Sequence, residues 1–93
     1  MVTDNKKYVD FFRALANEER LEIVKLLIQN KELAAQEVEK HFYLEQSTTS
    51  HHLNTLKRVN ILKSRKEGRN IYYSLDEDKF KMSWKTFEKL IIT

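Results

Sequence analysis

The stretch that decides the fold is "STTSHHLNTLKRVNILKSRKEGRNIYYSL", residues 47–75. Its first part places short polar side chains ahead of Leu53 and Leu56, which is the spacing of a helix with a polar N-terminal end. Its second part surrounds Gly68, the only glycine of the chain, and alternates after it, with Ile71, Tyr73 and Leu75 on one face. Alternation around a glycine is typical of a β-hairpin, because glycine tolerates the backbone of a tight turn. The sequence therefore predicts a helix that is followed directly by a hairpin.

Three further helices are predicted ahead of this stretch. The first has apolar residues three or four positions apart, namely Tyr8, Phe11, Phe12 and Leu15. The second begins after a capping residue, Asn17, and its apolar stripe comprises Leu21, Val24, Leu27 and Ile28, broadened by Ile23 and Leu26. The third covers "ELAAQEVEKHF", residues 32–42, through Leu33, Ala34, Val38 and Phe42.

The ends of the remaining elements follow from their polar residues. Ser47 is predicted to cap the fourth helix, which buries Leu53, Leu56 and Val59. Asn60 suits the left-handed backbone at the end of that helix. Asp76 is predicted to cap a last helix, whose apolar residues are Phe80, Trp84, Phe87 and Ile91. We therefore expect one domain over residues 1–93, mainly α with a small β-hairpin. Four helices, a hairpin and a fifth helix make a winged helix-turn-helix.

Composition excludes several classes of protein. The chain has no cysteine, which removes disulfides, thiolate catalysis and thiolate metal sites. No apolar run approaches the roughly 20 residues of a membrane span, and the N-terminal residues have no signal-peptide pattern. We therefore expect a cytoplasmic protein without membrane contact.

The charge is concentrated in one segment. Between Ser47 and Tyr73, six cationic residues face a single acid, Glu67, which gives this segment a net charge of +5. The whole chain carries +3, so the rest of it carries −2. A basic segment on a slightly acidic body indicates a surface for a polyanion. The alternative is an ordinary solvated face.

Three functions compete for the hydroxyl and histidine residues at the start of the quoted stretch. Catalysis would pair Ser47 or Ser50 with His51 or His52, but no glycine-containing elbow surrounds these residues. A metal site would need converging ligands, whereas adjacent histidines diverge on a helix and His41 belongs to another element. The third function is recognition of a nucleic acid by the helix tip. We expect neither an enzyme, a metal site nor a cofactor.

Nucleic-acid recognition accounts for both halves of the stretch. Short polar side chains at a helix N-terminus can bind phosphates and base edges in the major groove, and a cationic hairpin can reach flanking phosphates. Duplex DNA is preferred because the major groove of RNA is too narrow for a helix. The predicted DNA-binding residues are Gln46, Ser47, Thr48, Thr49, Ser50, His51, Asn54, Lys57, Arg65, Lys66 and Arg69.

The terminal helices carry more apolar side chains than so small a core requires. Packing against a second copy would bury them and would place two recognition helices one DNA turn apart. The alternative is that they belong to the core of one chain. The predicted dimer interface comprises Tyr8, Phe12, Phe80, Trp84, Phe87, Leu90 and Ile91.

From about Phe12 to Asp76 the sequence resembles the ArsR/SmtB family of winged-helix repressors. The resemblance rests on "FRALANEERLEIVKLL", "QSTTSHHLNTLKRVNIL" and "KSRKEGRNIYYSL". It implies that Ser47, Ser50 and His51 enter the major groove and that Arg69 lies near the tip of the wing.

The sequence departs from the family at its sensing sites. The resemblance implies metal sensing through cysteines, which this chain lacks, or through a site on the last helix. The positions of that second site hold Glu77, Lys79, Leu90 and Thr93, so three of its four ligands are missing.

These features together predict a homodimeric regulator of transcription. It binds a palindromic operator in double-stranded DNA and acts as a repressor. The alternatives are an activator or anti-silencer of the same fold, and a protein-interaction module in which DNA binding is incidental.

Overall fold

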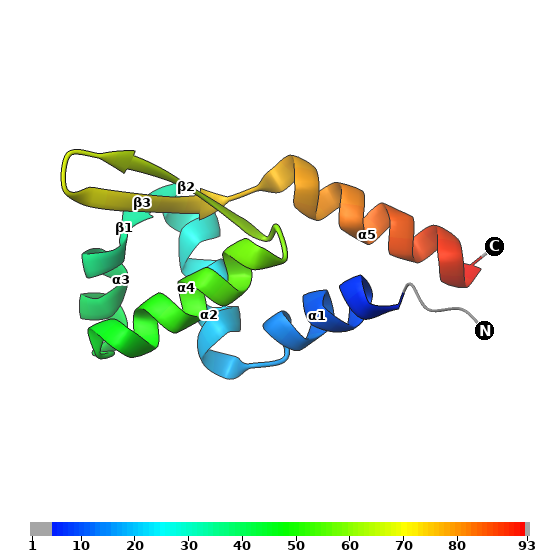
Figure 1. Cartoon of the computed structure of the whole chain (residues 1–93), viewed down its shortest axis with the longest axis horizontal. Helices are drawn as coiled ribbons and strands as arrows, with labels where there is room; N and C mark the ends of the chain where they lie inside the picture. The colour runs from blue at the N-terminus through cyan, green and yellow to red at the C-terminus, as the bar shows by residue number, and fades with distance from the viewer. Residues whose placement is uncertain (1–4, 93) are drawn as a thin grey trace.

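The computed structural model describes residues 5–92 and has the expected order of helices and hairpin, with one additional strand (Figure 1). The elements are α1 (Lys6–Leu15), α2 (Glu18–Asn30), β1 (Glu32–Ala34), α3 (Ala35–Phe42), α4 (Gln46–Arg58), β2 (Leu62–Glu67), β3 (Asn70–Leu75) and α5 (Glu77–Ile92). The predicted winged helix-turn-helix is confirmed, and α3 and α4 form its helix-turn-helix.

Most of the predicted ends and turns are confirmed. The side chains of Asn17 and Asp76 each accept a hydrogen bond from the backbone N–H three residues further on, at 3.0 and 3.3 Å, and so cap α2 and α5. Asn60 has a φ of 64° after α4, and Gly68 has a φ of 63° at the hairpin turn. Such positive φ angles favour these two residue types over most others.

The predicted cap of α4 is wrong. The helix begins at Gln46, and the capping position belongs to Glu45, whose carbonyl oxygen accepts from the N–H of Thr49 at 3.0 Å. No side chain caps this end. Ser47 therefore lies inside the first turn, where it is exposed and free to contact a ligand.

The predicted start of the third helix is also wrong. Residues 32–34 form β1, which pairs antiparallel with β3 and places Leu33 opposite Tyr73. The hairpin is thus part of a three-stranded sheet with the order β1-β3-β2. The helix begins only at Ala35.

The core joins α1, α2, α3, α4 and the sheet. Its buried residues are Phe11, Ala14, Ile23, Val24, Leu27, Val38, Leu53, Leu56, Ile61, Leu62 and Tyr73. The stripe predicted for α2 is partly wrong, because Leu21 and Ile28 are 45% and 58% exposed while Ile23 and Leu26 are buried. The predicted burial of Leu53 and Leu56 is confirmed, and Val59 is half-buried at the end of α4.

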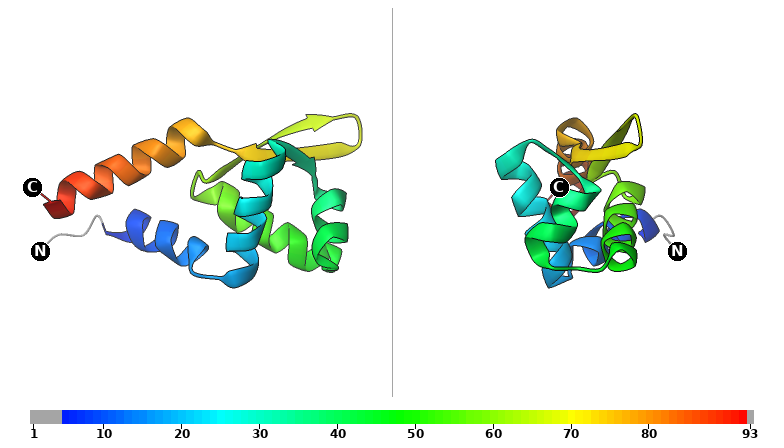
Figure 2. Two further views of the ribbon diagram at one scale, coloured as in Figure 1. Left: turned by 180° about the vertical axis from the view of Figure 1, so that it is seen from behind. Right: turned by 90° about the vertical axis from the view of Figure 1, so that its left-hand side faces the viewer.

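Helices α1 and α5 project together from the end of the molecule opposite the hairpin tip (Figures 1 and 2). Aromatic side chains join them within one chain. The ring of Phe87 lies 4.7 Å from that of Phe12 and 5.5 Å from that of Tyr8, and Phe80 lies 5.7 Å from Phe11. Within residues 5–92, no helix is both long and apolar enough to cross a membrane.

Candidate nucleic-acid interface

The exposed side of α4 carries most of the residues that the sequence assigned to DNA. Those with exposed side chains are Gln46, Ser47, Ser50, His51, Asn54 and Lys57, and Thr48 is half-buried. They recur every three or four positions, so they form one stripe along the helix. On the opposite side, Leu53 and Leu56 are fully buried. One face of α4 therefore packs in the core, and the opposite face is exposed to solvent.

The sequence predicts Thr49 on this surface, and the structure contradicts that prediction. Its side chain is fully buried, since Thr49, Leu53 and Leu56 share one helix face. Among residues 5–92, its hydroxyl oxygen has no hydrogen-bond partner. Thr49 therefore contributes to the packing of α4 and cannot reach a ligand.

The burial of Thr49 leads to a test by Thr49→Val. Valine has nearly the same shape, and leaving a buried hydroxyl unpaired costs roughly 1–3 kcal/mol. We expect the variant to be more stable by about 1 kcal/mol in urea denaturation, with unchanged affinity for DNA. A lower stability would mean that the hydroxyl makes a hydrogen bond, and weaker DNA binding would mean that it is a contact.

His52 fixes α4 against α2. Its ring is 5% exposed, with Nε2 at 2.8 Å from Oε1 of Glu19 and Nδ1 at 3.2 Å from a guanidinium nitrogen of Arg20. A guanidinium group can only donate, so Nδ1 accepts and Nε2–H donates to Glu19. Arg20 also donates to the carbonyl oxygen of Ala14 at 2.7 Å. These hydrogen bonds orient α4 without using its exposed stripe.

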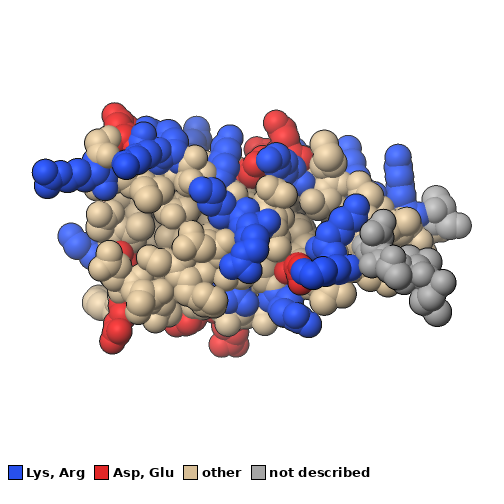
Figure 3. Space-filling view, viewed as in Figure 1, with Lys and Arg blue, Asp and Glu red and all other residues tan. Residues whose placement is uncertain are grey.

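The hairpin supplies the cationic part of the surface. Lys66 and Arg69 are exposed near its tip, on either side of Gly68. Figure 3 shows Lys and Arg atoms gathered over the hairpin, and a largely uncharged surface over the N-terminal half of α4. A polar surface is suited to contacts with base edges, and a cationic surface beside it is suited to contacts with the neighbouring phosphates.

Arg65, also assigned to DNA, is bound to carboxylates of its own chain. Its guanidinium makes two hydrogen bonds of 2.8 Å to Glu32 and one of 2.6 Å to Glu67, and it lies 4.7 Å from the ring centroid of Tyr72. The hydrogen bond from Arg65 lowers the pKa of Glu32, and the carboxylates of Glu32 and Glu67 raise the pKa of Arg65. Arg65 thus links β2 to β1 across β3.

The structure also brings cations to this region that the sequence reasoning did not assign. Arg13 of α1, Arg20 of α2 and Arg58 of α4 lie at one cleft beside the exposed stripe. Their separation in the sequence hides this proximity. Tyr43, in the turn before α4, is 94% exposed.

The two alternatives to nucleic-acid recognition, a metal site and a catalytic pair, each require a specific geometry. Among residues 5–92, no group of three or more His, Asp or Glu side chains is placed to hold a metal ion. In the same range, neither His51 nor His52 is hydrogen-bonded to a serine.

The residues predicted for a dimer interface divide into two groups. Tyr8, Phe12, Phe80 and Phe87 contact aromatic rings of their own chain and are half-buried. Trp84, Leu90 and Ile91 are 46%, 63% and 63% exposed. A groove between α1 and α5 is lined by Tyr8, Val9, Phe12, Phe87, Leu90 and Ile91, among others.

Comparison with known proteins places this geometry among regulators of transcription. Residues 17–64 match the profile described as "Bacterial regulatory protein, arsR family". The chain is 37% identical to the cadmium resistance transcriptional regulatory protein CadC of Listeria innocua, over 75% of this chain and 59% of CadC. The chain thus spans about three fifths of the length of that relative.

Two other relatives are covered more fully. The transcriptional activator HlyU of Vibrio cholerae is 36% identical over 87% of this chain and 74% of its own. The transcriptional repressor SdpR of Bacillus subtilis is 34% identical over 70% of this chain and 71% of its own.

Solved structures match over the whole chain. HlyU of V. cholerae has a TM-score of 0.74 at 31% identity and covers 100% of both chains. The homodimeric winged helix-turn-helix DNA-binding domain Mb0332 of Mycobacterium bovis also has a TM-score of 0.74, at 26% identity, and covers 100% of this chain and 93% of its own.

Proposed function

Since this chain belongs to the arsR family of bacterial regulatory proteins, we propose that it regulates transcription by sequence-specific binding to double-stranded DNA. The observation that carries the proposal is the exposed stripe of α4 beside the cationic hairpin. Ser50, His51 and Asn54 can donate and accept hydrogen bonds at base edges, while Lys66 and Arg69 can bind phosphates. The proposal includes no catalytic step.

We propose that the protein binds DNA as a homodimer. The groove between α1 and α5, together with the exposed side chains of Trp84 and Leu90, leaves an apolar surface at the end of the molecule away from the hairpin. A second copy, related by a twofold axis at this end, would cover that surface. Two copies of α4 could then bind the two halves of a palindromic operator. The homodimeric state of Mb0332 supports this assembly.

We propose repression as the mode of regulation, because a compact dimer on an operator blocks access to a promoter that overlaps it. The name of SdpR, a transcriptional repressor, supports this mode. Activation is the second candidate, because HlyU, a transcriptional activator, matches the entire chain in its structure. A promoter fusion distinguishes the two: deletion of the regulator raises expression under repression and lowers it under activation.

The proposal is tested by selecting genomic DNA fragments with the purified protein. We expect enrichment of an inverted repeat whose half-sites lie one helical turn apart. A Ser50→Ala/His51→Ala variant should fail to enrich it. If the native protein enriches no duplex, or if the variant enriches the same one equally well, the protein-interaction alternative replaces this proposal.

Arg69 is expected to act through phosphates. Removing it by Arg69→Ala takes two contacts from a dimer, and each contact contributes about 0.9 to the slope of log K against log salt, so the slope should become shallower by about 2. The matched control is Arg65→Gln, because Glu32 and Glu67 already bind that guanidinium. We expect its slope to stay unchanged. An unchanged slope for Arg69→Ala with an altered base preference would instead make Arg69 a base contact.

A further inference from the structure

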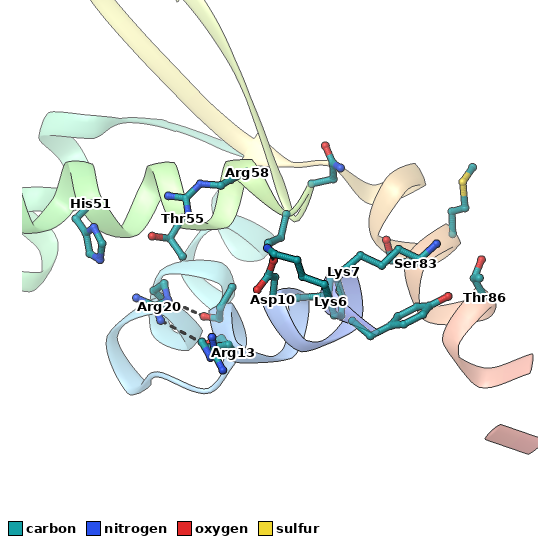
Figure 4. A pocket seen from close by; sticks show the side chains of 16 residues that line it. Lys6, Lys7, Asp10, Arg13, Arg20, His51, Thr55, Arg58, Ser83 and Thr86 are labelled. Atoms are coloured by element: carbon teal, nitrogen blue, oxygen red, sulfur yellow. Dashed lines mark hydrogen bonds and ion pairs between the residues drawn. The ribbon is translucent and has the colours of Figure 1, made fainter. Parts of the chain in front are cut away.

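A cleft of about 650 Å³ separates the exposed stripe of α4 from the helices at the other end of the molecule. Residues of α1, α4 and α5 line it, and Arg20 of α2 reaches its edge (Figure 4). Its cationic side chains are Lys6, Lys7, Arg13, Arg20 and Arg58. Among the described residues that line it, the one carboxylate is Asp10.

The cations outnumber their acidic partners. Asp10 forms an ion pair with Lys6 at 2.7 Å. Within residues 5–92, no carboxylate lies within 4.0 Å of the guanidinium groups of Arg13, Arg20 or Arg58. The hydrogen bond from Lys6 lowers the pKa of Asp10, and the charges of Arg13 and Arg58 lower it further. Positive charge from both α1 and α4 therefore converges on this cleft.

The cleft continues the surface that α4 presents. His51, Thr55 and Arg58 line it from one side of α4, next to the stripe that carries Ser50 and Asn54. Figure 3 shows this face, with a second group of Lys and Arg atoms over the C-terminal end of α4 and over α1. A ligand that spans the stripe of α4 would therefore meet these cations as well.

We propose that this cleft binds backbone phosphates of the operator between its two half-sites, an inference that rests on the proposed function. In a dimer joined through α1 and α5, the cleft lies between the recognition helix and the twofold axis. With each α4 in a major groove, the DNA that passes this position is the backbone beside the intervening minor groove. Guanidinium groups bind phosphate oxygens well because their donors match the geometry of phosphate.

A small free anion is a weaker candidate for the same cleft. The side chains of Lys6, Lys7, Arg13 and Arg58 are exposed, and exposed charges gain little from a single counterion in water. A polyanion gains more, because each contact releases a counterion condensed on the DNA. The ligand that fits this cleft better is therefore a chain of phosphates.

The test compares Arg13→Gln/Arg58→Gln with the native protein on the selected operator, over a range of salt concentrations. The variant removes four contacts from a dimer, so the slope of log K against log salt should become shallower by about 3.6, with base preference retained. Neither side chain forms a hydrogen bond or ion pair in the described part of the chain, so the circular dichroism spectrum should stay unchanged. Arg13 also lines the groove between α1 and α5, and sedimentation should show that the variant remains a dimer. The control is Lys25→Gln/Lys31→Gln, which removes the same charge from exposed positions of α2 and its end. Its slope should not change.

A second arm neutralises the DNA instead of the protein. Methylphosphonates placed between the half-sites should weaken binding of the native protein and leave the double variant unaffected. The inference is wrong if the slope is unchanged, or if methylphosphonates weaken both proteins equally. It is also wrong if inorganic pyrophosphate binds the DNA-free protein saturably through Arg13 and Arg58 while the slope on DNA stays the same, which would assign the cleft to a small anion. If the native protein selects no operator, the proposed function fails as well.

Discussion

Leu90→Glu is expected to convert the protein to a monomer and to reduce operator binding to the nonspecific level. Leu90 lines the groove between α1 and α5 and is 63% exposed in one chain, so a carboxylate at this position is solvated in the monomer. In a dimer joined here, two carboxylates would be buried in an apolar setting, which costs several kcal/mol without a partner. Each monomer can bind only one half-site, so the loss on the operator should be at least about 10³-fold.

Sedimentation and circular dichroism test this expectation together. The variant should sediment as a monomer with a near-native spectrum, because the core around Leu53 and Leu56 does not involve Leu90. Ile28→Glu is the matched control: Ile28 is 58% exposed on α2 and lies outside the groove, so that variant should remain a dimer. A dimeric Leu90→Glu protein with full affinity would place the interface elsewhere.

Phe87 would be a less direct choice for the same test. Its ring packs against Tyr8 and Phe12 of its own chain, so Phe87→Glu should separate α5 from α1 even in a monomer. The sequence cannot distinguish these two roles, because apolar residues three or four positions apart indicate which face of a helix is buried but not what covers it. The structure distinguishes the two residues, because Phe87 packs within its own chain whereas Leu90 is exposed.

Local signals predicted the elements whose ends depend on a single residue. Asn17 caps α2, Asn60 ends α4 with a positive φ, and Gly68 forms the turn of the hairpin. Each of these features follows from the conformational preferences of one residue type. The spacing of the apolar residues then changes from a helical to an alternating period, which distinguishes α4 from the hairpin that follows it.

The sequence does not predict two features that depend on distant partners, and one prediction overlooks a local signal. Residues 32–34 fit a helical pattern, and they form a strand because β3, about 40 residues later, offers its free edge. Thr49 was grouped with its polar neighbours, although its spacing from Leu53 and Leu56 already indicated the buried face. Likewise, Arg13 and Arg58 line one cleft, although they belong to helices that are far apart in the sequence.

Thr48→Ala/Ser50→Ala/His51→Ala is expected to remove most of the preference for the operator over random DNA. Ser50 and His51 are exposed and Thr48 is half-buried, and all three lie on the N-terminal half of α4. The opposite face of this helix packs in the core. A good specific contact contributes about 1–3 kcal/mol of discrimination. At the lower figure, six lost contacts in a dimer amount to about 6 kcal/mol, or roughly 10⁴ in the ratio of specific to nonspecific binding.

The two affinities respond differently because they have different physical origins. Nonspecific binding depends on phosphate contacts made by cations such as Arg69, which this variant retains, so its affinity and salt slope should change little. Thr49→Val, one position from both Thr48 and Ser50, is the matched control and should keep the full preference, because its side chain is buried. The measurement is a competition between labelled operator and random duplex for each protein. Equal loss on both DNAs would make Thr48, Ser50 and His51 phosphate contacts, and base discrimination would then have to come from Asn54, Lys57 or the hairpin.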